Sequence, residues 1–393
     1  MIIRGGAELR SAPAGRMLAL RHFHKKPAWA VSPCRRDETM MLDQACNVSN
    51  LTDSQEKLNS FSNSAPPTTV DLLKQYQAVR EGAGLFDLCD WTRISITGPD
   101  RITFLHGLVS NEVKRLSSGK ANYSLFLTPQ GKIIADFHLL ACDQELILFG
   151  KTTIRNPLFD GLNKYLIMEE VEIHDATDSH TLFSVRGLRS VEKSALLLNH
   201  NSLPDEYNHI PASIATIPCL ILHVPHSGKA SFDILAQCEH RDSLRKAFLD
   251  AGIIPIGADV EEILRVEAGI PLLGQDIDQK TIPQEAHLDH AISYTKGCYV
   301  GQEVMARLHF RGHVNRELTG FILETDEIPQ TPLSIVSDAK DVGIITSVVY
   351  SLGLQKTIGL GFLRCELRDT GTAVDVFHGE QHVKAFVHPL PFV

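Results

Sequence analysis

TRISITGPDRITFLHGLVSNEV, residues 92–113, and NYSLFLTPQGKIIADFHLL, residues 122–140, are the stretches that decide the fold. In the first, Ile94 and Ile96 alternate with polar residues, which predicts a strand, and a helix is expected to follow it. In the second, two apolar runs flank the turn-forming residues 129–131, which is typical of a β-hairpin. Strands and helices that mix without regular βαβ alternation favour the α+β class.

The same mixture continues on both sides of these stretches. Upstream, Thr69 can cap a helix with an apolar face. Downstream, we expect strands at 145–151, 170–175, 181–186, 217–224 and 230–236, and helices at 153–168, 189–198, 239–251 and 258–268. Residues 69–315 are therefore expected to form an α+β region of two subdomains.

The pattern changes at Arg316, where six short strand-like runs follow one another without a helix. This predicts a small C-terminal β-barrel domain over residues 316–393. At the other end, residues 47–69 are polar and rich in Ser and Asn, which indicates a linker. We expect residues 1–68 to be a disordered N-terminal extension.

Charge and composition narrow the classes of function. The chain has a net charge of −9, although its first 36 residues carry eight basic side chains and one acid. The acidic body argues against nucleic-acid binding, and no apolar run is long enough to span a membrane. We expect a cytoplasmic monomer. The alternative is an organellar protein, if the basic N-terminus is a transit peptide.

Residues 262–316 combine glycines with acids and bases at an expected domain junction, which suits a polar ligand better than a core. Within them, residues 296–303 read KGCYVGQE. Lys296 lies two residues before Cys298, and a nearby cation favours a thiolate. The simpler alternative is a packed, inert cysteine. None of the eight cysteines forms a CxxC pair, and we expect no permanent metal site.

The segment KGCYVGQE closely resembles the signature of the YgfZ family. The preceding RVEAGIPLLGQDID and the following FRGHVNREL are also similar to that family, and the stretches around 86–113 and 124–140 resemble the glycine-cleavage T-proteins. The resemblance covers about residues 70–393. It implies a T-protein-like fold, with two interlocked α+β domains and a C-terminal barrel around a folate pocket.

By the same resemblance, the chain is expected to bind tetrahydrofolate and to support iron–sulfur client proteins or their assembly factors. Cys298 and Lys296 carry over as the working groups. The expected folate-binding segment continues through Tyr299, Gly301, Gln302 and Glu303.

Three residues outside the signature are further candidates. Glu285 can pair with the N–H groups of a pterin, or cap a helical turn. Arg265 lies on an expected helix and can point at the pocket. Asp136 follows Ala135 where T-proteins carry paired aspartates, and it faces either the pocket or solvent.

The loss of one acid at Ala135 argues against aminomethyl transfer, because that chemistry needs charge near the folate nitrogens. We therefore expect an accessory protein for iron–sulfur enzymes. The alternatives are a folate-dependent aminomethyltransferase and a scaffold that binds folate without chemistry.

Overall fold

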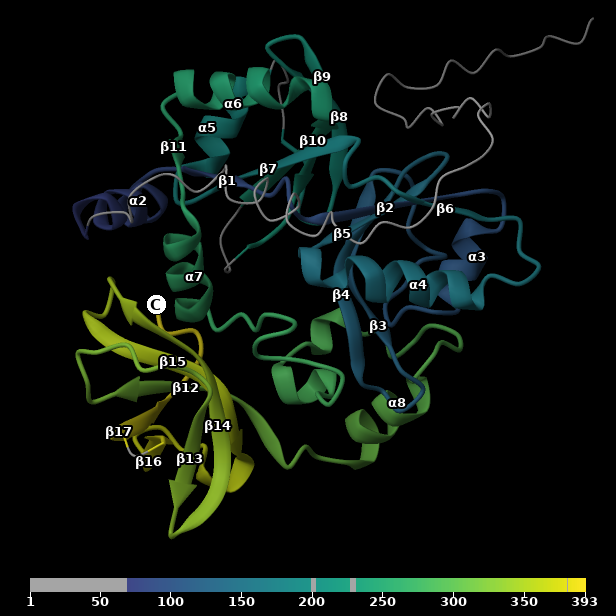
Figure 1. The fold of residues 1–393 in the computed structure, drawn as a ribbon. Coiled ribbons are helices and arrows are strands. Elements are labelled where there is room, and N and C mark those ends of the chain that lie inside the picture. Colours follow the sequence, from purple (N-terminus) through teal and green to yellow (C-terminus); the bar gives the residue numbers. More distant parts are fainter. Residues whose placement is uncertain (1–68, 199–202, 227–230, 380) are drawn as a thin grey trace, which may run out of the picture. The chain divides into compact units, whose positions relative to one another are not determined.

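The computed structural model describes residues 69–198, 203–226, 231–379 and 381–393 (Figure 1). All of these ranges belong to one compact unit. The expected extension, residues 1–68, lies outside the described residues. Within the described ranges, no helix combines the length and apolar character needed to cross a lipid bilayer.

The first sheet is built around the predicted hairpin. Its five strands lie in the order β3 (Lys120–Leu127), β4 (Ile133–Ala141), β5 (Leu146–Gly150), β2 (Thr92–Thr97) and β6 (Glu172–Asp175), and all neighbours are antiparallel. The helices of this region are α3 (Arg101–His106), the 3-10 turn η2 (Thr152–Ile154) and α4 (Arg155–Tyr165). Leu158 and Leu162 of α4 are fully buried, because their spacing places both on one face of the helix.

The second sheet has six strands. They lie in the order β11 (Ile254–Pro255), β1 (Gly84–Asp87), β7 (His180–Arg186), β10 (Ser231–Gln237), β9 (Ile217–His223) and β8 (His209–Ile214). Helices α5 (Ser190–Leu197) and α6 (Arg241–Asp250), with the 3-10 turn η3 (Cys238–His240), belong to this region. Phe183 of β7 packs edge-on against Phe248 of α6 in the core, with ring centroids 5.5 Å apart.

The C-terminal strands form a closed barrel. They run β12 (Arg316–Leu323), β15 (Lys356–Arg364), β14 (Lys340–Ser351), β13 (Leu333–Ser337), β16 (Ala373–His378) and β17 (Gln381–His388), and β17 pairs with β12. The 3-10 turn η6 (Cys365–Leu367) follows β15. Phe321, Ile335 and Ile345 are fully buried in the barrel core, as alternation along short strands requires.

Two helices and two short turns connect these parts: α2 (Thr69–Glu81), α7 (Ala258–Glu267), η4 (Pro283–Ala286) and η5 (Asp289–Ala291). Glu267, at the end of α7, is fully buried. Its carboxylate accepts hydrogen bonds from Tyr76 of α2 at 2.9 Å and from Ser351 of β14 at 2.6 Å, and it also pairs with Arg80. One buried acid therefore fastens α2, α7 and the barrel together.

The sequence did not predict helix α8 (Gln302–Arg311). Met305 is the only fully buried residue that α8 contributes, and Val304 and Leu308 are partly buried beside it, so the helix has a short apolar face that the sequence analysis did not use. It packs on the hairpin turn: a Cβ at Gly131 would lie 2.6 Å from the Met305 methyl carbon. Figure 1 shows α8 at the end of the β3–β4 hairpin. The short strands β1, β8 and β11 were also not predicted.

Candidate pocket

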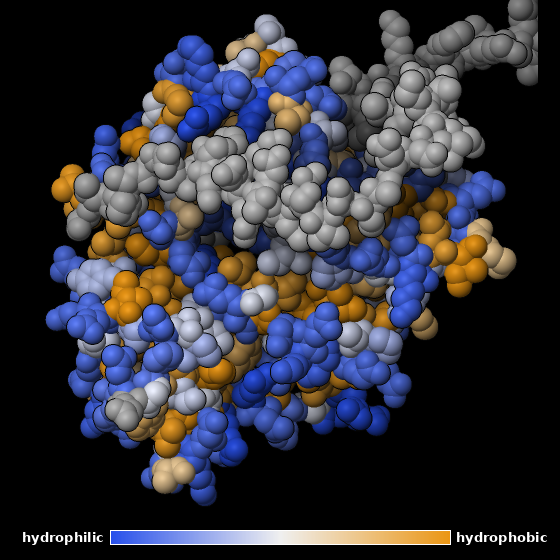
Figure 2. All heavy atoms as spheres, viewed as in Figure 1, coloured by the Kyte–Doolittle hydropathy of each residue, from blue (hydrophilic) through white to orange (hydrophobic). Residues whose placement is uncertain are grey.

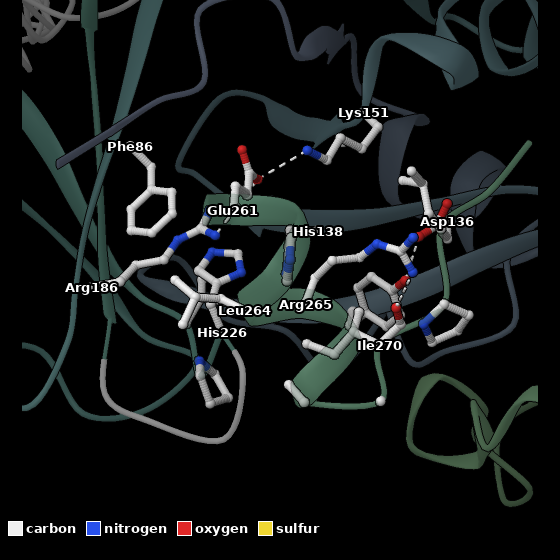
Figure 3. Close-up of a pocket in the computed structure, with 18 of the residues that line it drawn as sticks. Phe86, Asp136, His138, Lys151, Arg186, His226, Glu261, Leu264, Arg265 and Ile270 are labelled. Atoms are coloured by element: carbon white, nitrogen blue, oxygen red, sulfur yellow. Dashed lines mark hydrogen bonds and ion pairs between the residues drawn. The ribbon is translucent and has the colours of Figure 1, made fainter. Parts of the chain in front are cut away.

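A cavity of about 520 Å³ is enclosed by residues of both sheets, α7 and the turns η4 and η5. That size is typical of pockets for small organic ligands. Figure 2 shows that the face seen in Figure 1 exposes apolar residues mainly in a band across its middle, and hydrophilic residues around it. Figure 3 shows the polar side chains of the cavity, with Arg186, His226 and Glu261 on one side of the view and Asp136 on the other.

The acid of the pocket is Asp136 on β4. Tyr123 of β3 donates a hydrogen bond from its hydroxyl to Asp136 Oδ2, at 2.5 Å. Burial raises the pKa of Asp136 above its ordinary value, although the Tyr123 hydrogen bond and the Lys151 charge oppose this shift. The ring of Tyr123 stacks on His290 of η5, with centroids 5.5 Å apart and an angle of 13° between the planes. A half-buried carboxyl held by a phenol can take up and release a proton closer to neutral pH than a solvated one.

Ala135 does not face the pocket. Side chains alternate along β4, so Ala135 lies on the opposite face from Asp136, and it is fully buried. An aspartate at position 135 would enter the core of the sheet. The missing acid therefore removes no carboxylate from the cavity, and the argument against aminomethyl transfer that we drew from Ala135 loses its basis.

The opposite side of the pocket holds a small ionic cluster. Glu261 of α7 accepts a hydrogen bond from Lys151 at 3.0 Å and lies 3.8 Å from Arg186 of β7. Burial tends to raise the pKa of Glu261, but the charges of Arg186 and Lys151 outweigh it and hold that pKa below its ordinary value. The Arg186 guanidinium also lies over the Phe86 ring, 4.3 Å from its centroid. With Lys151 and Arg186 as cations and Glu261 as the anion, these three groups carry one net positive charge.

Histidines occupy the middle of the pocket. His226 bonds to the buried Asp233 at 3.0 Å, and its ring meets the His138 ring at 5.7 Å. Burial is the main cause that lowers the pKa of His138 to about 3, and the charge of His226 is the second. The His138 imidazole is therefore neutral at physiological pH. Among the described residues, His138 Nδ1 and Arg186 Nη2 are buried and have no hydrogen-bond partner. They are two of eight such buried side-chain atoms among the described residues, so they do not by themselves indicate a ligand.

Arg265 lines the pocket, as expected, but its guanidinium is occupied. It bonds to Asp276 at 2.7 Å, to Glu262 at 2.5 Å and to Ser347 of the barrel at 2.6 Å. Asp276 also accepts hydrogen bonds from the hydroxyls of Thr346 and Ser347. Arg265 therefore links α7 to the barrel, and it offers no free charge to a ligand.

The segment 296–303 lies outside the residues that line this pocket. Cys298 is exposed, whereas Lys296 is buried and donates hydrogen bonds to three backbone carbonyl oxygens. The expected pairing of the ammonium with the thiol is thus absent among the described contacts. Tyr299 is buried beside Lys296, whose ammonium lies 5.0 Å from the ring centroid.

Of the remaining candidates from the sequence, Gly301, Gln302 and Glu285 make local structural contacts, and their expected role in binding folate stays a prediction. Gly301 has a φ of +85° at the start of α8, a backbone conformation that favours glycine, and a Cβ there would lie 2.7 Å from the Thr128 carbonyl oxygen. Gln302 reaches the Lys296 carbonyl at 3.5 Å, and Glu303 is exposed. Glu285 caps η4 through the Ile282 N–H and pairs with Arg316 at 3.2 Å, so its capping interpretation fits the geometry better.

Comparison with known families agrees with this architecture. The model of the GCVT N-terminal domain matches residues 56–296, and that of the glycine cleavage T-protein C-terminal barrel domain matches residues 316–393. The chain belongs to the glycine cleavage T-protein family. The T-protein-like fold expected from the sequence is confirmed, with two α+β domains and a closed barrel. The narrower YgfZ assignment is not what these matches show.

Several similar proteins are named aminomethyltransferases. The chain is 30% identical over 340 residues to the aminomethyltransferase of a Synechocystis species, covering 83% of this chain and 90% of that protein. It is 28% identical to the aminomethyltransferase of a Nostoc species, covering 86% and 92%. Aminomethyltransferase T of Bartonella henselae has the same fold, with a TM-score of 0.74 at 22% identity over 83% of this chain and 90% of that one.

These relatives correct one expectation. The accessory role for iron–sulfur proteins, expected from the resemblance of residues 296–303, is wrong, because the similar proteins are aminomethyltransferases. The alternative that we retained, folate-dependent aminomethyl transfer, agrees better with them.

Proposed function

We propose that the chain binds a reduced folate in the pocket and transfers an aminomethyl-derived one-carbon unit to it. The observation that carries this proposal is Asp136, a half-buried acid with a raised pKa on the pocket face of β4. The names of the relatives support the reaction class.

The residues of the pocket suit a folate. Tyr123 and His290, which stack on each other, add aromatic surface to the lining of the cavity. Lys151 and Arg186 line the same cavity and can supply cations for the polar groups of a ligand. The cavity volume of about 520 Å³ is ample for a flat ring system with a substituent.

Asp136 supplies the charge that the chemistry needs. Folate would contribute two nitrogens that bond to the methylene carbon, while the bonds from that carbon to the lipoyl sulfur and to the amine nitrogen break and release the lipoyl thiol and ammonia. Ionised Asp136 stabilises positive charge that develops next to the folate nitrogens, and its carboxylate can accept a proton that one of them loses. Tyr123 fixes the orientation of the carboxylate through its hydrogen bond. The YgfZ-type signature marks the chain, in this proposal, as a variant branch of the family.

A binding and transfer assay on matched variants tests the proposal. Calorimetry with tetrahydrofolate measures affinity, and formation of methylenetetrahydrofolate from an aminomethylated lipoyl carrier protein measures transfer. Asp136→Asn should bind folate with similar affinity and lose transfer by roughly 10²-fold or more, the usual contribution of a positioned acid or base. Asp160→Asn, which removes an exposed acid on α4, is the control and should behave as the wild type.

Two results would contradict the proposal. If the wild type neither binds tetrahydrofolate nor transfers, the pocket serves another ligand. If Asp136→Asn transfers as fast as Asp160→Asn, Asp136 is not the working group.

A further inference from the structure

The Lys296 ammonium is bound by three backbone carbonyl groups. Its Nζ donates hydrogen bonds to the carbonyl oxygens of His106 and Val109, both at 2.7 Å, and of Asn111 at 2.8 Å. All three N–H donors of an ammonium are thereby used. The Tyr299 ring covers the ammonium, with its centroid 5.0 Å from Nζ. The lysine of the KGCYVGQE signature thus holds the segment 106–111, which follows α3.

This segment contacts β3 and η5, two elements that contribute residues to the lining of the pocket. The side-chain amide of Asn111 donates to the carbonyl oxygen of Tyr123 at 2.9 Å and reaches that of His290 at 3.4 Å. Ser110 bridges the same two elements, because its hydroxyl donates to the Ala291 carbonyl at 2.6 Å and accepts the Leu125 N–H at 2.9 Å. A shift of this segment would therefore move β3 relative to η5.

We infer that Lys296 is a positioning residue for the pocket, which acts through Asn111 and Tyr123 on the carboxyl group of Asp136. The chain of contacts runs from the ammonium to the Asn111 carbonyl, from the Asn111 side chain to the Tyr123 backbone, and from the Tyr123 hydroxyl to Asp136. In this inference Lys296 positions the carboxyl group of Asp136 and does not act on the thiol of Cys298.

The cost of burying this group supports a specific role. Burial lowers the pKa of Lys296 to about 8. The charge of Glu112 raises this pKa, and the charge of Lys114 lowers it further. A neutral amine has two donors and would leave one carbonyl without its partner. A purely structural lysine would act on overall stability, whereas a positioning lysine must also change the titration of Asp136.

The titration of Asp136 separates these roles without any folate. The Tyr123 hydrogen bond lowers the pKa of Asp136, and Lys151 is the other charged group that acts on it. Loss of that hydrogen bond in Tyr123→Phe should raise the pKa by roughly one unit, the scale of a hydrogen bond to a charged group. Lys296→Met, which keeps the apolar chain and removes the donors, should raise it in the same direction by a smaller amount.

The experiment is a carboxyl carbon NMR titration of the full chain labelled at aspartate, with the Asp136 signal assigned through Asp136→Asn. The variants are Lys296→Met, Tyr123→Phe and the double variant. The control is Lys193→Met, because Lys193 also donates to a backbone carbonyl, that of Ala251 at 3.0 Å, but does not line the pocket.

We expect the double variant to match Tyr123→Phe alone, because both changes act through one hydrogen bond. Lys193→Met should leave the Asp136 pKa unchanged. The inference is overturned if Lys296→Met leaves that pKa unchanged while lowering the unfolding temperature, or if the two shifts simply add.

The catalytic meaning of the inference rests on the proposed function, and a second readout separates the two. In the transfer assay, the acid limb of the pH profile should move to higher pH in Lys296→Met as in Tyr123→Phe. If the wild type does not transfer, the proposed function fails, but the NMR titration still decides the role of Lys296.

Discussion

Replacing Ala135 by aspartate restores the paired acids of T-proteins and tests which face of β4 serves the pocket. The Ala135 side chain is fully buried on the face opposite Asp136. A carboxylate placed there loses its hydration, and an uncompensated buried charge costs about 3–5 kcal/mol. Natural domains are stable by only about 5–15 kcal/mol, so Ala135→Asp should lose a large part of the free energy of unfolding.

Urea unfolding followed by circular dichroism at pH 7 measures this loss. Ala135→Asn has nearly the same volume without the charge, so the difference between the two variants isolates the cost of the carboxylate. Transfer activity per folded molecule should not rise in either variant. If Ala135→Asp keeps the urea midpoint of the wild type and transfers faster, then position 135 faces the pocket and our assignment of the strand faces is refuted.

Three further outcomes follow from the geometry. The pKa of His138 is about 3 in the folded chain against an ordinary 6.5, so the unfolded chain binds that proton more tightly and the free energy of unfolding falls as pH drops through this interval. His138→Phe should therefore flatten the pH dependence of the urea midpoint between these values. An unchanged slope would argue against a neutral, buried His138. Cys298 is exposed, and the Lys296 ammonium is held by backbone carbonyl groups and not by the thiol. Iodoacetamide should therefore alkylate Cys298 at equal rates in the wild type and Lys296→Met, as measured by mass spectrometry. If alkylation is several-fold slower in Lys296→Met, the ammonium lies beside the thiol. Arg265→Met leaves the buried Asp276 without its cation and should lower the free energy of unfolding by about 3–5 kcal/mol in urea titrations; a loss below about 1 kcal/mol would show that the neighbouring hydroxyls suffice.

The sequence predicted most of the fold, because its main elements carry strong local patterns. The hairpin at 122–140 and the six strands after Arg316 are present, and the apolar runs of the hairpin are buried over most of their length. The elements that were missed are stabilised by tertiary contacts. Helix α8 contributes only Met305 to the core, and β1 is a four-residue strand whose pairing with β7 cannot be read locally.

The pocket was harder to predict than the fold. Asp136 and Arg265 were named from the sequence and line the cavity, but Tyr123, Arg186 and Glu261 were not. Each of these three lies in an ordinary strand or helix pattern, where a polar residue is usually a solvated face. Their meeting depends on how two sheets and α7 pack, which short-range periodicity does not encode.

The functional role of residues 296–303 stays a prediction, although the structure gives them a local role as well. Their unusual composition suggested a reactive site, whereas their glycines and lysine shape the turn before α8 and hold a neighbouring segment. A constrained backbone and a ligand site leave similar marks on a sequence, since both call for glycine and for charges at fixed spacing.

The buried carboxylate of Glu267 has a consequence for synthesis on the ribosome. Its partner Tyr76 precedes it by 191 residues, and Ser351 follows it by 84. At roughly 5–20 residues per second, Glu267 is made about 10–40 s after Tyr76. Helix α2 has only 13 residues, too few to be stable alone. The first described helix to leave the ribosome must therefore wait for its contacts with β11 and α7, and a chain that ends before Ser351 leaves the buried Glu267 without its hydrogen bond from the barrel.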